Sequence, residues 1–312
     1  MNAKLTDKDM QAIFGRVKNW GRWGGDDQAG ALNFITPEKR VAAAKLIRSG
    51  RTVSCARDFP VRPAPENPWP ALHHMVIAGD DPCIPGVKGL EASTDFIGIA
   101  FHGLASSHID ALCHVFVEGK MYNGYDATEV KSTGARKNSI MCAKDGIVGR
   151  GVLLDIPAIQ SRSFIDPGHQ ITLAELTAAE AKAGVKVGEG DILLVYTGRD
   201  ARAREAPDPA GGPVKLVGLD PETIPWLHER RIAVLGADGV HDPQPPGRFE
   251  AWPIPVHMCA LVAMGVHLLD NLYLEDLAKA CAQEKRWEFF LAVAPLRIAG
   301  GTGSPVNPIA TF

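Results

Sequence analysis

Short apolar runs of strand length recur over the last two thirds of the chain, and they restrict the fold more than any other feature of the sequence. They occur at 96–101 (FIGIAF), 152–156 (VLLDI), 192–197 (ILLVYT), 232–235 (IAVL) and 289–293 (FFLAV). Runs of this length and near-continuous apolarity are typical of strands that are buried on both faces. We therefore expect a sheet whose two faces are both covered by other elements.

Helices are predicted between these runs. Thr172 and Glu175 form a capping-box sequence, and Gly184 is a suitable C-cap for the helix that starts there. Further helical stretches are expected to begin near Pro221 and near Leu274. Strands that alternate with helices indicate an α/β fold.

The N-terminal third has a different character. Thr36 and Pro37 are an N-cap and a first helical residue, and the helix that they start is predicted to run to Gly50. The stretch 59–89 contains seven prolines, which predicts irregular structure that wraps the surface or a neighbouring subunit. His73 and His74 lie in this stretch and would reach a site only if it folded over.

The chain shows no internal repeat, low-complexity tract or linker, so one domain is predicted over residues 1–312. Within it we expect an N-terminal helix and Pro-rich arm over 1–90 and a catalytic core over 91–312.

The charge balance argues against several partners and locations. The chain has a net charge of −3, and its basic residues are scattered. They form no basic stripe that could bind nucleic acid or an anionic membrane. The N-terminus lacks the apolar core of a signal peptide, and no apolar run approaches the roughly 18 residues that span a bilayer. We therefore expect a cytoplasmic protein with a small-molecule substrate. The six cysteines form no CxxC pair, which favours free, mostly buried thiols over a zinc ribbon or a disulfide framework.

A histidine cluster follows the first apolar run. His102, His108, Asp110 and His114 lie within thirteen residues, and these residue types bind transition metals or transfer protons. In an extended segment, His108 and Asp110 project from the same face and can converge on one cation. Imidazole with carboxylate suits Mn, Fe or Zn better than Ca or Mg. The ring of His114 would be free to act as an acid or base if a helix began after Leu112.

This segment resembles the cyclase family, which includes bacterial kynurenine formamidase and isatin hydrolase and carries the pattern HxGTHxDxPxH. The stretch SHIDALCH at 107–114 matches its second half, and WGGDDQAGALNFITPEKRVAAA, YNG and APLRIAGGTGSPVNPIA resemble the longer members. The resemblance implies a single-domain cyclase-like fold of the swivelling β/β/α type, with a mixed sheet flanked by helices. It also implies that His108 and Asp110 bind the catalytic metal and that His114 is the general acid/base.

Two positions depart from the pattern, since its first histidine falls on Leu104 and its proline on Leu112. Leucine cannot bind a metal, which favours one ion per chain over the two of the formamidases. His102 is predicted to contact the substrate or the outer shell of the site, with replacement of the missing ligand as the alternative.

The second half of the site is expected within residues 236–272. By the same resemblance, His257 opens a helix and binds the metal, and Asp270 is a ligand or orients one. His241 is a candidate for substrate contact. His267 is interpreted as a core histidine, and Asp238 either takes part in catalysis or caps the next turn.

These expectations describe a hydrolase with one Mn²⁺ or Zn²⁺ ion that activates water against an amide, lactam, formamide or lactone. The resemblance favours the C–N bond of a small cyclic or aryl substrate, and a homodimer or homotetramer. Two alternatives remain: a metal-assisted cyclase or lyase in which His114 removes a carbon-bound proton, and a non-catalytic binding protein of the same fold. A Ser or Cys nucleophile is disfavoured, because there is no GxSxG motif.

Overall fold

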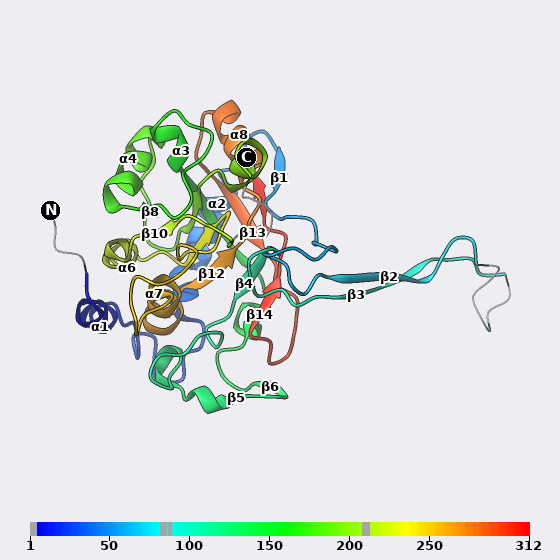
Figure 1. Cartoon of the computed structure of the whole chain (residues 1–312), viewed down its shortest axis with the longest axis horizontal. Helices are drawn as coiled ribbons and strands as arrows, with labels where there is room; N and C mark the ends of the chain where they lie inside the picture. The colour runs from blue at the N-terminus through cyan, green and yellow to red at the C-terminus, as the bar shows by residue number, and fades with distance from the viewer. Residues whose placement is uncertain (1–4, 82–85, 87–88, 208–212) are drawn as a thin grey trace.

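A nine-stranded mixed sheet runs through the molecule (Figure 1). The computed structural model describes residues 5–81, 86, 89–207 and 213–312. In sheet order the strands are β1 (Thr52–Ser54), β15 (Ile309–Thr311), β13 (Glu288–Val293), β7 (Ile147–Asp155), β9 (Ile192–Tyr196), β11 (Val234–Ala237), β12 (His267–Asp270), β4 (His108–Asp110) and β14 (Gly303–Pro305). Strands β7, β9, β11 and β12 are parallel to one another, and the remaining neighbours are antiparallel.

The apolar runs around β7, β9, β11 and β13 are strands, as predicted, and both faces of the sheet are covered. Along β9, Leu193 and Val195 pack into one core, and Ile192 and Leu194 pack into the other, as alternation along a strand requires. The first core is closed by α1 (Asp7–Arg16), α4 (Leu173–Ala183), α6 (Ile224–Arg230) and a π helix (Met258–Met264), and the second by α8 (Glu275–Glu284). These features confirm the single-domain α/β prediction.

The helices begin largely where their caps predict. They are α1 (Asp7–Arg16), α2 (Pro37–Ala44), α3 (Ile156–Ile159), α4 (Leu173–Ala183), α5 (Arg199–Glu205), α6 (Ile224–Arg230), α7 (Pro255–His257), the π helix η6 (Met258–Met264) and α8 (Glu275–Glu284). Short 3-10 turns span Gly30–Phe34, Tyr122–Gly124, Ala127–Glu129, Ile140–Ala143 and Pro221–Thr223. The Thr172 capping box and the left-handed Gly184 C-cap of α4 are confirmed. The predicted extension of α2 to Gly50 is wrong, since that helix ends at Ala44 and turns follow it.

A two-stranded hairpin projects from the body of the molecule (Figure 1), and it corrects two predictions. It pairs β2 (Leu72–Ile77) with β3 (Thr94–Gly98). Residues 72–77 are therefore a regular strand within the Pro-rich stretch, and the run 96–101 is not a buried strand of the main sheet. The exposed fractions of Val76 and Ile97 are 65% and 54%. β-branched and aromatic residues favour extended backbone whether or not another layer covers them, so composition could not report burial here.

Two further pairs of short strands complete the description. Strands β5 (Val130–Lys131) and β6 (Gly134–Ala135) form one ribbon, and β8 (Gln170–Ile171) and β10 (Gly218–Leu219) form another.

Among the described helices, none combines the length and apolarity needed to cross a membrane. The described cysteines are free, four of them buried and Cys142 partly so, as predicted, and Cys83 lies outside the described residues.

Candidate metal centre

Strand β4 brings the first pair of candidate ligands to one face of the sheet. It lies between β12 and β14 and is antiparallel to both, with His108 opposite Asp270. Because β4 is extended, His108 and Asp110 project from the same face, while Ile109 packs into the core behind them. No helix begins directly after Leu112; a turn follows β4, in which the His114 N–H donates to the carbonyl of Ala111.

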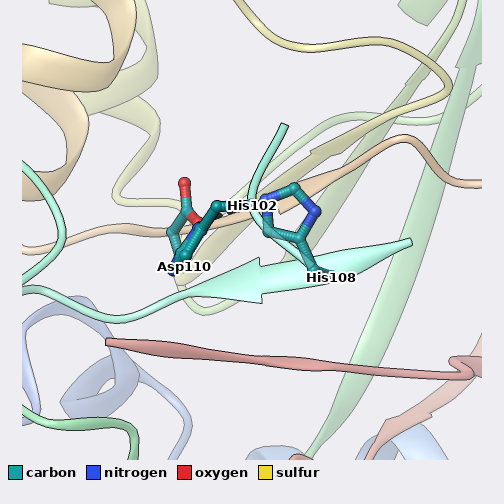
Figure 2. Close-up of side chains that lie close together, drawn as sticks. All are labelled: His102, His108 and Asp110. Carbon is teal, nitrogen blue, oxygen red and sulfur yellow. Dashed lines mark ion pairs between the residues drawn. The ribbon is translucent and has the colours of Figure 1, made fainter. Parts of the chain in front are cut away.

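Asp110 is the centre of the cluster. Its Oδ1 lies 3.0 Å from His102 Nδ1, 3.3 Å from His108 Nε2 and 4.0 Å from His114 Nε2. Its Oδ2 lies 3.7 Å from His257 Nε2. Figure 2 shows His108 and Asp110 on the same side of β4, with His102 beside them. One buried carboxylate therefore faces histidines from both halves of the sequence.

The second half of the site comes from the ends of β11 and β12. Both strands are parallel, so their carboxyl ends meet at one edge of the sheet. Asp270 ends β12, and its Oδ2 and Oδ1 lie 3.3 Å from His257 Nε2 and 3.1 Å from His241 Nε2. His257 ends the short helix α7 and continues into the π helix. The structure thus brings every predicted metal ligand into one buried cluster.

The sequence reasoning missed Asp242. This buried carboxylate lies 2.6 Å from His257 Nδ1, on the side of the ring away from Asp110. Asp242 precedes its partner His257 by fifteen residues. A separation of this kind gives no periodic signal in the sequence. Its neighbour His241 was noticed, and the structure places the His241 ring behind Asp270, almost fully buried.

Electrostatics within the cluster separate its histidines. Burial alone would lower the pKa of His108, but Asp110 and Asp270 raise it to about 9. Burial also lowers the pKa of His257, but Asp270 and Asp242 outweigh burial and raise this pKa well above its ordinary value. Burial lowers the pKa of His114 to about 4, so this ring is neutral at pH 7. The His114 ring stacks on that of His102, with centroids 3.8 Å apart, which disfavours charging both rings.

The donor atoms fit a divalent cation. Both oxygens of Asp110, Oδ1 of Asp270 and Nδ1 of His102 are buried without a hydrogen bond of good geometry. Buried polar atoms are rarely left unbonded, and such convergence of carboxylates and imidazoles is what a transition metal requires. Two groups of three have ligand atoms within 4.8 Å of one another: His102, His108 and Asp110, and Asp110, His257 and Asp270. Asp110 belongs to both.

Two other residues singled out in the sequence have structural roles. Asp238 accepts hydrogen bonds from the backbone N–H groups of Thr197, Gly198 and Arg199, so it caps the turn into α5. His267 is fully buried in β12, with its Nε2 3.4 Å from Cys142 Sγ, and burial lowers its pKa to about 4. It is a core histidine, as interpreted.

The loop that carries His102 is held by Asn271, another residue that the sequence did not reveal. Its amide donates to the carbonyls of Gly103 and Ser106, and its Oδ1 accepts from Arg199. Asn271 is fully buried with φ 54°. It directly follows Asp270, so one short segment supplies a candidate ligand and fastens the opposite loop.

A cavity of about 250 Å³ adjoins the cluster at this loop. Its apolar walls include Trp69, Phe101 and Leu104, and His102 lies on its inner side, toward Asp110. A small ring-containing molecule fits a space of this size and character.

Comparison with known proteins places the chain in a family. The Cyclase family model matches residues 52–241. A crystal structure described as a novel cyclase is 38% identical, covers 95% of this chain and 99% of its own, and superposes with a TM-score of 0.85. The chain belongs to the cyclase family. Isatin hydrolase A from Labrenzia aggregata, bound to benzyl benzoate, shares the fold at 22% identity and a TM-score of 0.59, covering 83% of this chain and 93% of its own.

A second isatin hydrolase, bound to the product analogue thioisatinate, gives the same TM-score at 20% identity and covers 88% of this chain and 98% of its own. A search of curated proteins finds no match. As a cyclase-family chain, this one carries leucine at the first histidine of the pattern. The Leu104 carbonyl accepts a hydrogen bond from Arg199, while His102, two residues earlier, points to Asp110.

Proposed function

We propose that this cyclase-family protein is a metal-dependent hydrolase that cleaves the C–N bond of a small cyclic or aryl amide, lactam or formamide, or the corresponding lactone. The observation that carries the proposal is the carboxylate of Asp110. It is fully buried, neither oxygen has a good hydrogen bond, and histidines converge on it from both halves of the sequence. A cation satisfies such a group best.

The residues divide the chemistry between them. Asp110, His108 and His257 would hold the ion, with Asp270 as a further ligand. A divalent ion held by these residues would lower the pKa of a coordinated water and polarise a carbonyl. His114, neutral at pH 7, accepts a proton from the attacking water and returns it to the leaving nitrogen or oxygen.

The substrate class is supported by the cavity and by the relatives. The apolar walls around Trp69, Phe101 and Leu104 suit an aryl ring and bring its carbonyl toward His102 and the cluster. Isatin hydrolases, which share the fold, act on isatin, a cyclic aryl amide. Mn²⁺ and Zn²⁺ both accept imidazole and carboxylate ligands.

The test is the metal content of protein purified without chelator, measured by elemental analysis for the wild type and for Asp110→Asn. We expect one Mn or Zn per chain in the wild type and none in the variant, since Asp110 belongs to both ligand groups. The exposed Asp166→Asn is the matched control and should keep its metal. Two ions per chain would mean that His102 completes a second site. A wild type that stays metal-free after incubation with excess Mn²⁺ and Zn²⁺ would overturn the proposal.

We also propose that the chain forms a homodimer or homotetramer through the β2–β3 hairpin. A two-stranded hairpin is marginally stable in water. This one exposes apolar side chains, namely Leu72, Met75, Val76, Phe96 and Ile97. Burial of these side chains against another copy would stabilise both the hairpin and the assembly.

Light scattering during size exclusion measures this directly. The wild type should elute as a dimer or tetramer, and Ile97→Lys should shift it toward the monomer because a charge cannot be buried there without a partner. Val41→Lys, at an equally exposed apolar position on α2, should leave the assembly unchanged. A monomeric wild type would contradict the proposal.

A further inference from the structure

We propose that Asp242 is the positioning residue that fixes the ring of His257 and thereby sets how tightly the site holds its metal. The inference rests on the proposed metal site. Asp242 follows β11 in the segment that leads to His257, and it is almost fully buried. It is one of three carboxylates in the cluster, and its oxygens face away from the other two.

The contacts of Asp242 are all made with one turn of the chain. Its Oδ2 lies 2.6 Å from His257 Nδ1 and accepts the backbone N–H of His257 at 3.1 Å. Its Oδ1 accepts the backbone N–H of Val256 at 2.8 Å. The carboxylate therefore contacts both the ring and the backbone of His257. These contacts restrict rotation of the ring.

The consequence appears on the opposite edge of the ring. With Nδ1 held by Asp242, Nε2 of His257 faces Asp270 at 3.3 Å and Asp110 at 3.7 Å. A carboxylate behind a ligating histidine fixes its tautomer and increases the basicity of the ligating nitrogen. Asp242 meets the geometric requirement for that role without touching the ion.

The partner of His108 makes the assignment more specific. His108 Nδ1 lies 2.8 Å from the carbonyl of Ser106, so a neutral group orients that ring. Only a carboxylate adds negative charge behind the imidazole. We therefore assign to His257 Nε2 a stronger electron-pair donation to the metal than to His108 Nε2.

A purely structural role is the competing explanation, because Asp242 also caps the start of α7 through Val256 and His257. A double-mutant cycle separates the two roles. Asp242→Asn keeps the shape but loses the charge, and His257→Gln removes the ring through which the proposed effect passes. Asp242→Glu, which keeps the charge, is the second variant in case the amide impairs folding.

The measurement is the dissociation constant for Zn²⁺, obtained by competition with a chelating dye. We expect Asp242→Asn to weaken binding by about 10- to 100-fold in the wild-type background, as loss of such carboxylates does, and by less than about 3-fold in His257→Gln. Asp242→Glu should recover part of the affinity. An unchanged affinity, or an equal loss in both backgrounds, would overturn the proposal.

A metal-free readout distinguishes failure of this inference from failure of the proposed function. In crystals of a metal-free Asp242→Ala variant, which lacks the acceptor for His257 Nδ1, the His257 ring should rotate away from the orientation that directs Nε2 at Asp110 and Asp270. A ring that keeps this orientation would overturn the positioning role, whether or not the wild type binds metal. If the wild type binds no Zn²⁺ and the ring rotates as expected, only the proposed function fails.

Discussion

The two halves of the cluster are built in different ways. His102, His108, Asp110 and His114 come from thirteen consecutive residues on β4 and its flanking loops. The other half gathers His241, Asp242, His257 and Asp270 from the ends of two strands and from a short helix. The alternation of side chains along one strand sets the first half, whereas packing between separate elements sets the second.

The histidine side chains of the two halves also differ in how far they are exposed to solvent. The side chains of His102 and His114 are 27% and 30% exposed, whereas those of His241 and His257 are 0% and 9% exposed. Of these four histidines, His102 lines the cavity of about 250 Å³ described above. The C-terminal half is closed and braced by Asp242, which suits holding an ion in place. The difference predicts that the accessible histidines, His102 and His114, serve proton transfer, and that the buried residues anchor the ion.

The largest effect that separates the halves is expected for His114→Ala. Because His114 Nε2 lies 4.0 Å from Asp110 and His114 belongs to neither group of candidate ligands, the variant should retain its metal. Loss of a general acid/base lowers kcat by about 10²- to 10⁴-fold. Metal analysis and kcat on a formanilide or cyclic aryl amide would measure both quantities, with His169→Ala, paired to Glu175 far along the chain, as the control.

The opposite pattern would break the comparison. If His114→Ala lost its metal together with its activity, His114 would belong to the anchoring half, and the cavity side of the cluster would have no separate role in proton transfer. A variant with full activity and full metal content would remove His114 from the mechanism.

The sequence predicted those parts of the fold whose signal is local. The burial of β9 on both faces and the capping box of α4 follow from adjacent residues, and the shared face of His108 and Asp110 follows from strand geometry. The hairpin was predicted wrongly because an apolar run does not report whether another layer covers it.

The site was predictable to a similar extent. The resemblance located His257 and Asp270, but Asp242 and Asn271 act through contacts that depend on how distant segments pack. No spacing rule connects Asn271 to Gly103, since 168 residues separate them. Supporting residues of this kind become visible only when the strands are placed side by side.

A smaller effect, on the stability of the fold, is expected when the contact that joins the two halves is removed. Asn271 follows the ligand Asp270 and donates two hydrogen bonds to the loop of His102, so Asn271→Ala should loosen one half without removing a ligand. Each of the two lost hydrogen bonds costs about 0.5–1.5 kcal/mol of unfolding free energy, and alanine at φ 54° adds backbone strain.

Urea denaturation of the metal-free protein measures that loss, and Asn271→Asp is the matched variant. Aspartate tolerates the left-handed backbone and still accepts from Arg199, but it cannot donate to the carbonyls of Gly103 and Ser106. Its buried carboxylate would also face those two carbonyl oxygens, so Asn271→Asp should be destabilised at least as much as Asn271→Ala. If both variants unfolded like the wild type, the halves would be fastened elsewhere, and the loop of His102 would have to be positioned by Arg199 alone.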